Sequence, residues 1–227
     1  MRSGWDRDAR YLLFDGVPFG TCHQHEDKLS IILWAYGKNL IVDGGTHYYD
    51  SSKWRQYVLT SQAHNVVIVD GQGQRRRIVE ESFVSKDPIN DPWVATDRLD
   101  YVASTFGYGY GLRRDIKAIH QRSVVFVKPD YWVVLDKLEP DRERTFETLF
   151  HLNVESAESQ GGVVYSQDNT GANISIHPIG PGMNVDIIKG REEPLLGWIA
   201  SAKKPIPTVV YRQRGKDPIV KIGRAHV

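Results

Sequence analysis

Short apolar or alternating runs follow one another along most of this chain, and this pattern constrains its fold most strongly. Glycine, proline, aspartate and asparagine separate the runs. Such segments are typical of strands, because successive side chains of a strand point to opposite faces of a sheet. The pattern predicts strands at 11–14, 30–36, 39–42, 65–69, 78–84, 93–95, 101–105, 116–127, 131–137, 145–152, 162–165, 172–177, 185–188 and 209–213.

Only one stretch, 51–62, has a convincing helical pattern, and Ser51 or Ser52 would cap its first turn. Strands do not alternate with helices, which argues against the βαβ units of a parallel sheet. Many strands of similar length with one short helix therefore predict an all-β fold, either a large antiparallel β-sandwich or a barrel. Pro129 and Asp130, between two long apolar runs, indicate a hairpin.

With 227 residues the chain is long enough to bury a full core, and we expect one domain over 1–221. After about Gly180 the strand pattern weakens, so that part is expected to form a smaller terminal sheet or edge strands. The last six residues, 222–227, resemble the translation of a sequencing adapter and are expected to be a non-native tail. The start is expected to be internal, because it enters the first run with almost no leader.

Charge and hydrophobicity exclude some partners. The net charge is +1, from 29 basic and 28 acidic side chains, so no global electrostatic argument favours a polyanionic partner, and no nucleic acid is expected as a partner. Local basic clusters such as 75–77 are more often solvated faces. No apolar run approaches the length of a membrane span.

Four polar side chains stand at the ends of otherwise apolar runs. His23 and His25 precede the run 30–36, Asp43 follows the run 39–42, and His64 precedes the run 65–69. On an extended chain His23 and His25 would point the same way. Converging imidazoles usually bind a metal or move a proton. The spacing matches no local zinc signature, so three unrelated polar strand ends stay open as the alternative to a metal site.

Several motifs, taken in order, carry a resemblance to a known family. Trp5-Asp6 is followed by Gly20-x-x-His23-x-His25-x-Asp27-x-Leu29-Ser30, Leu40-Ile41-Val42-Asp43-Gly44-Gly45 and Ala63-His64-Asn65-x-Val67-x-Val69-Asp70-Gly71. His120-x-Arg122 and Pro129-Asp130-Tyr131-Trp132 continue the series. In this order and spacing the chain resembles the heparinase II/III-like polysaccharide lyases up to about residue 200, most strongly before Gly71.

This resemblance implies a protein of two domains. The family has a helical toroid domain first and an antiparallel β-sandwich, a super-sandwich, second, so this chain would be the second domain alone. The resemblance places His23 at the active site. It makes His25, Asp43 and His64 the ligands of a structural zinc ion. The family's other catalytic groups, a tyrosine and an asparagine or histidine, would come from the missing helical domain.

The resemblance also implies a reaction, the cleavage of uronic-acid polysaccharides of the glycosaminoglycan or alginate type by β-elimination. A base removes the proton next to the carboxylate, and an acid protonates the leaving oxygen. An imidazole suits the base role because its ordinary pKa lies near neutrality. The expected partners are an acidic polysaccharide and the helical domain of the same chain. The expected location is the periplasm or the outside of the cell.

Five further residues are candidates for contacts with such a substrate. Aromatic rings stack on sugar rings, and a guanidinium group binds a carboxylate through two hydrogen bonds. Ordinary packing or a structural salt bridge is the alternative for each of them. The candidates are Tyr48, Arg55, Tyr108, Tyr110 and Arg122.

Two other classes of protein stay open. Without a helical domain the chain would be a non-catalytic, carbohydrate-contacting or structural sandwich, and we expect little or no lyase activity from it alone. The His-x-His pair also suggests a cupin-type metal oxygenase. That signature needs a glutamate a few residues later, where Leu29 and Ser30 stand instead. Two histidines and a carboxylate suit iron as well as zinc.

Overall fold

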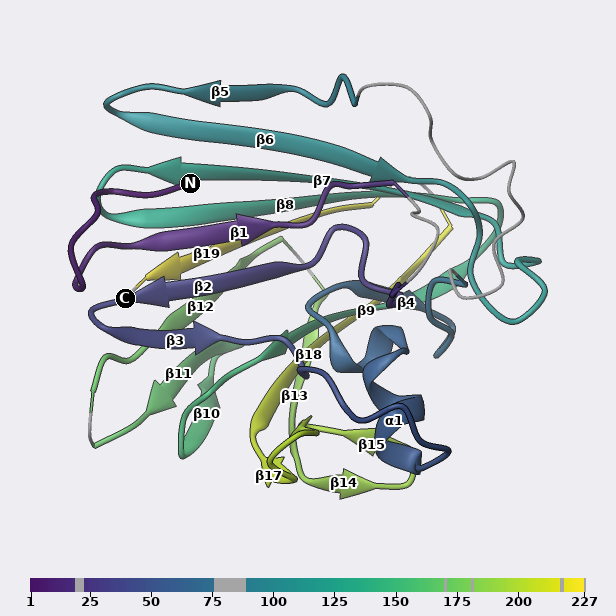
Figure 1. Cartoon of the computed structure of the whole chain (residues 1–227). Helices are drawn as coiled ribbons and strands as arrows, with labels where there is room; N and C mark the ends of the chain where they lie inside the picture. The colour runs from purple at the N-terminus through teal and green to yellow at the C-terminus, as the bar shows by residue number, and fades with distance from the viewer. Residues whose placement is uncertain (19–22, 76–88, 170, 181, 217–218, 227) are drawn as a thin grey trace.

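Three antiparallel sheets and two small hairpins form the fold in this computed structural model, which describes residues 1–18, 23–75, 89–169, 171–180, 182–216 and 219–226 (Figure 1). One sheet has the order β1 (Tyr11–Phe14), β2 (Ile31–Ala35), β3 (Lys38–Ile41). Another has the order β13 (Asn184–Lys189), β18 (Pro207–Gly215), β9 (Arg144–His151), β4 (Val67–Val69). The largest has the order β10 (Ser156–Gln160), β11 (Val163–Gln167), β12 (Ser175–Ile179), β19 (Ile219–His226), β8 (Tyr131–Pro140), β7 (Ala118–Val127), β6 (Leu99–Phe106), β5 (Trp93–Ala95). The hairpins are β14 (Arg191–Glu192) with β15 (Leu195–Leu196), and β16 (Trp198–Ile199) with β17 (Lys204–Pro205).

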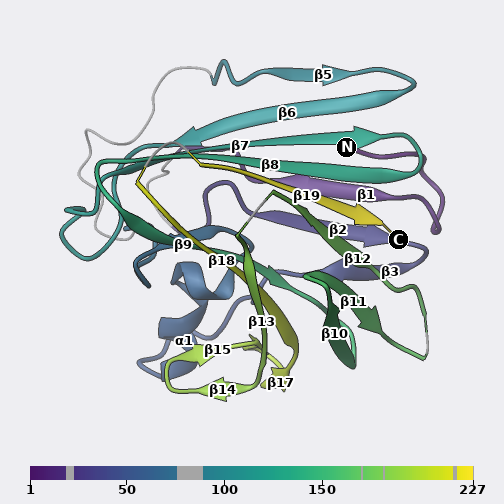
Figure 2. The ribbon, with the colours of Figure 1, turned by 180° about the vertical axis from the view of Figure 1, so that it is seen from behind.

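The eight-stranded sheet packs against a second layer made of the two smaller sheets (Figures 1 and 2). These two sheets meet where the Val42 N–H donates to the carbonyl of His151 at 2.9 Å and the Asn153 N–H donates to that of Leu40 at 3.0 Å. The main core cluster takes side chains from all three sheets, for example Leu33, Trp132 and Phe150. The structure is therefore an antiparallel β-sandwich, and the predicted fold class is confirmed.

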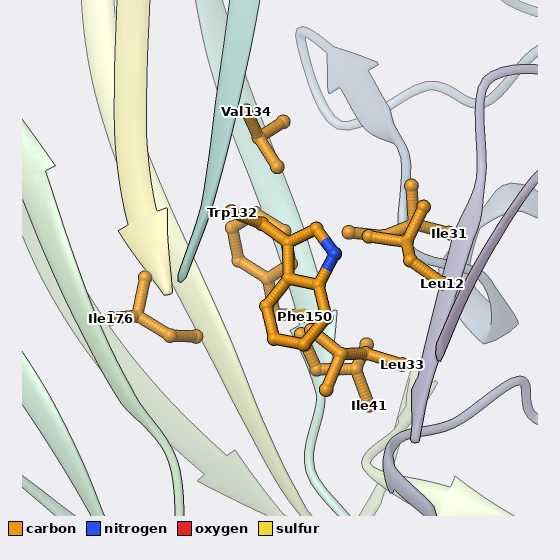
Figure 3. Close-up of a pocket in the computed structure, with 8 residues that line it drawn as sticks. All are labelled: Leu12, Ile31, Leu33, Ile41, Trp132, Val134, Phe150 and Ile176. Carbon is orange, nitrogen blue, oxygen red and sulfur yellow. The ribbon is translucent and has the colours of Figure 1, made fainter. Parts of the chain in front are cut away.

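A small apolar space remains in this core beside Trp132 (Figure 3). Its volume is about 10 Å³, and its lining includes Leu12 and Ile31 on one side and Ile176 on the other. The indole nitrogen of Trp132 points toward Leu12 and Ile31, and among the described residues it has no hydrogen-bond partner. The space accommodates one water at most, so it is a packing defect of the core and not a ligand site.

Most predicted strands are found, with differences after residue 150. The expected strand 78–84 lies outside the described residues, and β10, the four short hairpin strands and β19 were not predicted. The terminal part is divided: β18 pairs with both β9 and β13 inside the four-stranded sheet, where β13 is an edge strand as expected, and β14–β17 form the two small hairpins. Strand β19 includes 222–226 and pairs with β8 and β12. The non-native origin of 222–227 stays a prediction.

The helical stretch is shorter than the predicted 51–62. Helix α1 covers Lys53–Val58, and a 3₁₀ turn follows at Ser61–Ala63. Ser52 is the N-cap, and its side-chain oxygen accepts a hydrogen bond from the Arg55 N–H, as predicted for a serine in this place. No helix of the described part of the chain is long and apolar enough to cross a membrane.

Candidate metal centre and active-site residues

Three predicted metal ligands come together at one edge of the smaller sheets. His25 lies in the loop before β2, Asp43 lies just after β3, and His64 directly follows the 3₁₀ turn. One ligand atom from each of them lies within 4.8 Å of the others. His64 is completely buried, whereas His25 and Asp43 are half-buried. Long-range folding thus assembles a His–Asp–His cluster from positions up to 39 residues apart in sequence (25 to 64).

The contacts of His64 define the chemistry of this cluster. Its Nδ1 lies 2.6 Å from Oδ2 of Asp43, and its Nε2 lies 3.0 Å from the carbonyl oxygen of Val58. Both ring nitrogens therefore face acceptors. A neutral imidazole has one N–H, so it can donate to Asp43 or to Val58 but not to both, and satisfying both contacts requires a second proton or a cation beside the nitrogen that lacks one. The rings of His25 and His64 lie 5.3 Å apart, centroid to centroid.

Burial and the mutual charges of the cluster shift its pKa values. Burial lowers the pKa of His25, and the neighbouring His64 lowers it further. Burial alone would lower the pKa of His64, but the charge and hydrogen bond of Asp43 raise it overall. Burial alone would raise the pKa of Asp43, but His64 and the Gly45 N–H lower it overall. These shifts favour neutral His25 and ionised Asp43, which are the forms that bind a metal, whereas the raised pKa of His64 favours its protonated form, so a metal ion would have to displace that proton.

The cluster fits a transition-metal ion in its donor types and in its supporting contacts. Two imidazole nitrogens and one carboxylate form a set that zinc accepts, and the same set suits iron. The Val58 carbonyl can take the Nε2–H of His64, which leaves the Nδ1 lone pair toward Asp43. Asp43 also accepts the Gly45 N–H at 2.9 Å through Oδ1. Such outer contacts are the usual way in which metal ligands are oriented.

Asn65 fixes the position of His64 from within the core. Its side-chain amide donates to the carbonyls of Ile31 at 2.7 Å and Val42 at 2.8 Å. Its Oδ1 accepts the backbone N–H of His151 at 2.7 Å. One buried side chain therefore ties together β2, the end of β3 and the end of β9. This explains physically why an asparagine follows the histidine in the Ala63-His64-Asn65 motif.

His151 is a second buried histidine close to this centre, which the sequence indicated only as an ordinary strand residue. Its Nε2 lies 3.0 Å from the carbonyl oxygen of Gln62, and its Nδ1 lies 3.2 Å from Oδ1 of Asn65. Burial lowers the pKa of His151 to about 4, with a further contribution from His64. His151 is therefore neutral in the folded protein near pH 6, whereas it is protonated in part in the unfolded chain.

This difference predicts a stability that falls on acidification. Between pH 6.5 and 4 the unfolded chain binds a proton at His151 that the folded chain does not bind, so the free energy of unfolding decreases as the pH falls. We expect His151 to account for a loss of about 3 kcal/mol over this window. Urea unfolding of the wild type and of His151→Gln, both in metal-free buffer, measures it. Parallel pH profiles of the two proteins would contradict the assignment.

His23 does not lie on a strand, which corrects the alternation argument. Its φ is 56°, in the left-handed region, so His23 and His25 are not successive same-face residues of an extended chain. The ring of His23 is exposed, and its Nδ1 lies 2.6 Å from the hydroxyl of Tyr49. Arg55 lies over the Tyr49 ring, with its guanidinium carbon 4.5 Å from the centroid. His23 and His25 thus engage different partners.

The other candidate substrate contacts fall into two groups. Tyr48 is 81% exposed beside Tyr49, and Arg55 is half-buried on α1 near His25. Arg55 contacts Tyr49, the partner of His23, whereas the ring of Tyr48 packs edge-on against His47 and its contact with a substrate stays a prediction. Tyr108 is half-buried and packs edge-on against Phe106. Its contact with a substrate stays a prediction.

Tyr110 and Arg122 are completely buried, and this placement corrects the expectation that they contact substrate. Tyr110 packs against Phe106 in a second core cluster. Arg122 donates from Nε and Nη2 to the two oxygens of Asp136 at 2.7 and 2.9 Å. Its Nη1 donates to the carbonyl of Asn65 at 2.5 Å. Arg122 therefore supports the core next to the His–Asp–His cluster, through Asn65, in the structural role that was its alternative.

Tyr49 and His151 are the site residues that sequence reasoning did not select. Tyr49 stands in the aromatic pair after the Gly44-Gly45 turn, which offered a weak signal. His151 offered no such signal, because it ends a run that reads as an ordinary strand.

A hollow of about 400 Å³ lies beside α1, lined among others by Lys53, Gln56 and Glu192. No member of the His–Asp–His cluster lines it.

Fold and site together define an all-β sandwich domain that carries a histidine–aspartate cluster at a sheet edge and an exposed histidine nearby. The family model described as "Heparinase II/III-like, C-terminal" matches residues 2–204. The chain therefore belongs to the heparinase II/III-like family and represents its C-terminal domain. No support remains for the cupin-type oxygenase.

Relatives and solved structures agree with this assignment. The heparin-sulfate lyase of Pedobacter heparinus is 22% identical over 225 residues, 96% of this chain and 31% of that protein. The heparin-sulfate lyase of Bacteroides stercoris is 23% identical over 223 residues, 95% of this chain and 29% of that protein. The crystal structure of the heparan sulfate lyase HepC from Pedobacter heparinus is 19% identical, with a TM-score of 0.76 over 99% of this chain and 34% of that chain. The chain thus spans about a third of the length of the curated relatives it matches.

Proposed function

We propose that this chain is the sandwich domain of a lyase that cleaves uronic-acid polysaccharides by β-elimination, with His23 at its active site. The observation that carries the proposal is the exposed His23–Tyr49 pair next to a buried His–Asp–His cluster, in a domain of the heparinase II/III-like family. The two relatives are heparin-sulfate lyases, which favours a heparin-type glycosaminoglycan as substrate, and an alginate-type polymer is the alternative.

The contact with Tyr49 suits His23 to proton transfer. When Nδ1 of His23 carries the proton and donates to the Tyr49 hydroxyl oxygen, Nε2 keeps a lone pair. That nitrogen can remove the proton next to a uronate carboxylate, and the exposed ring leaves room for a sugar. Arg55, over the Tyr49 ring, can neutralise the carboxylate charge. Tyr48, exposed beside this pair, can stack on a sugar ring.

We also propose that His25, Asp43 and His64 hold a structural zinc ion. When bound, zinc supplies a fixed junction between the three segments that carry its ligands and need not contact substrate. His25 is two residues from His23, so His25 positions the loop that presents the active-site histidine. The contacts of His64 with Val58 and Asp43 support this proposal.

The rest of the catalytic machinery is proposed to lie in a helical domain that precedes this one. The chain spans only about a third of its curated relatives, which leaves room for such a domain. We propose export to the periplasm or the outside of the cell, where acidic polysaccharides occur as substrates. The isolated chain would then act as a non-catalytic sandwich, with little or no lyase activity.

The test is a lyase assay of the protein together with its upstream domain, recovered by sequencing the source DNA before Met1. Formation of unsaturated uronate from heparan sulfate is followed by ultraviolet absorbance. We expect His23→Ala to lower kcat/KM by at least about a hundredfold, because a general base contributes this much or more. We expect Tyr49→Phe to cause a smaller loss, because it removes the hydroxyl group and keeps the ring.

Tyr165→Phe is the matched control, since Tyr165 lies exposed on β11, in the other layer of the sandwich. Its activity should equal that of the wild type. Full activity of the His23→Ala protein would refute the role of His23. Strong activity of the isolated chain would refute the need for a helical domain.

A further inference from the structure

The outer face of the three-stranded sheet carries an exposed group of aromatic side chains. Alternation along β1 turns Leu12 into the core and leaves Tyr11 outside, and Tyr11 pairs across the strands with Trp34. Tyr11 and Trp34 are each 37% exposed, and Tyr36, after the end of β2, is 44% exposed. Trp5, in the segment before β1, is 87% exposed. These rings form a partly exposed aromatic surface, in which Trp5 is the most exposed and Trp34 contacts the segment before β1.

Two arginines are stacked on these rings. The guanidinium carbon of Arg2 lies 3.5 Å from the centroid of the Trp5 ring and 5.8 Å from that of Tyr11. Arg10 lies 4.7 Å from the centroid of Tyr36 and donates to its hydroxyl oxygen. We call this set, Arg2, Trp5, Arg10, Tyr11, Trp34 and Tyr36, the aromatic–arginine face.

The backbone holds this set in place. The backbone of Arg2 forms an isolated antiparallel β-bridge with Tyr11. The backbone N–H of Arg2 also donates to a carboxylate oxygen of Asp100 at 3.3 Å. The indole N–H of Trp34 donates to the carbonyl of Arg7 at 3.3 Å. The segment before β1 is therefore fixed over the edge of the sheet, and its rings and cations are presented together. A surface ordered in this way binds a ligand at a lower entropic cost than free side chains would.

The aromatic rings and guanidinium groups of the aromatic–arginine face together favour one class of ligand. An aromatic ring stacks through a free face on the apolar face of a sugar ring. The guanidinium of Arg2 stacks on Trp5, and its N–H groups can bind carboxylate or sulfate groups, whereas Arg10 already donates one N–H to the Tyr36 hydroxyl. Alternating sugar faces and anionic groups occur together in acidic polysaccharides. Arg2 and Arg10 provide the complementary charge at two places along the surface.

We propose that the aromatic–arginine face is a second binding surface for an acidic polysaccharide, separate from the residues around His23. It shares none of its residues with the His–Asp–His cluster or with the His23–Tyr49–Arg55 group. It lies on β1, β2 and the segment before β1, whereas the cluster lies after the 3₁₀ turn and beyond the end of β3. Such a surface holds a long polymer beside the domain while another part of the polymer is processed. The proposal shares the ligand class with the proposed function and does not depend on His23 or on the metal.

The test is titration calorimetry of the chain with a heparin oligosaccharide, with neutral dextran as a second probe. We expect saturable binding of heparin that weakens with salt, and no binding of dextran. The double variant Arg2→Ala/Trp5→Ala should raise the Kd for heparin by about tenfold or more, because it removes one stacking and one ionic contact. The matched control Trp93→Ala/Arg214→Ala removes the same two residue types from other exposed positions and should leave the Kd unchanged.

The lyase assay separates this proposal from the active-site proposal. His23→Ala should lower kcat, whereas Arg2→Ala/Trp5→Ala should keep the wild-type kcat. The proposal is overturned if the Arg2/Trp5 double variant, with unchanged circular dichroism, binds heparin as the wild type does. Equal binding of dextran also overturns it. Self-association that the double variant abolishes, without any heparin binding, would assign the face to a second copy of the chain instead.

Discussion

Replacing Arg122 with methionine is expected to lower the free energy of unfolding by about 3–5 kcal/mol, because it leaves a buried charge without its partner. Arg122 is completely buried and binds both oxygens of Asp136. Burial alone would raise the pKa of Asp136, but Arg122 and His120 hold it well below its usual range. The carbonyls of Leu29 and Asn65 would also lose their donor. Urea unfolding at neutral pH measures the loss.

The exposed Arg212 provides the control for this effect. Arg212 also binds carboxylates, those of Glu147 and Asp186, but its side chain is 39% exposed. Arg212→Met should cost less than about 1 kcal/mol, as solvated ion pairs usually do. A double variant, Arg122→Met with Asp136→Leu, should recover part of the loss, since it also removes the unpaired carboxylate. An Arg122→Met protein as stable as Arg212→Met would show that the buried pair has no such role.

Removing the proposed metal is expected to lower the free energy of unfolding by an amount similar to that of the Arg122 substitution. At a free zinc concentration about a thousandfold above its Kd, a metal that binds only the folded chain stabilises it by about 4 kcal/mol. We therefore expect a chelator to lower the free energy of unfolding by that amount. His25→Ala should abolish the difference between chelated and zinc-loaded protein. His25 is half-buried, so its removal disturbs the fold less than removal of the fully buried His64.

The matched histidine control is His177→Ala on β12, a half-buried histidine outside the cluster. This variant should keep both its zinc and the response to the chelator. Metal analysis of the purified proteins accompanies the unfolding experiments and identifies the ion. A metal content that is the same with and without His25, or iron in place of zinc, would contradict the proposed centre.

The strands of the sandwich could be predicted because their signal is local. Successive side chains of a strand point to opposite faces of the sheet, so the order of the residues alone predicts that Tyr11 is exposed and Leu12 is buried. The same holds for Ser52, which caps the helix next to it in sequence. The antiparallel class followed from the lack of helices between strands. The very short hairpin strands carried too few residues to show a pattern.

Positions at strand ends indicated His25, Asp43 and His64 among four candidates, but only the resemblance to a family selected these three as a ligand set. No periodicity relates His25, Asp43 and His64, because each lies in a different loop or turn. The pairing of β3 with the end of β9, through Val42 and His151, brings these loops together. Contacts of this kind depend on residues more than a hundred positions apart, and a local pattern does not encode them.

By itself the sequence determined the succession of strands, their inner and outer faces and the family to which the chain belongs. Only the tertiary structure decided which polar groups became buried partners. It placed Arg122 and Tyr110 in the core instead of at a substrate surface, and gave His23 a left-handed backbone with Tyr49 as its partner. The physical reason is that a buried arginine is stable only where a carboxylate and backbone carbonyls accept its hydrogen bonds. These acceptors come from different segments, and only the packing of the sheets brings them together.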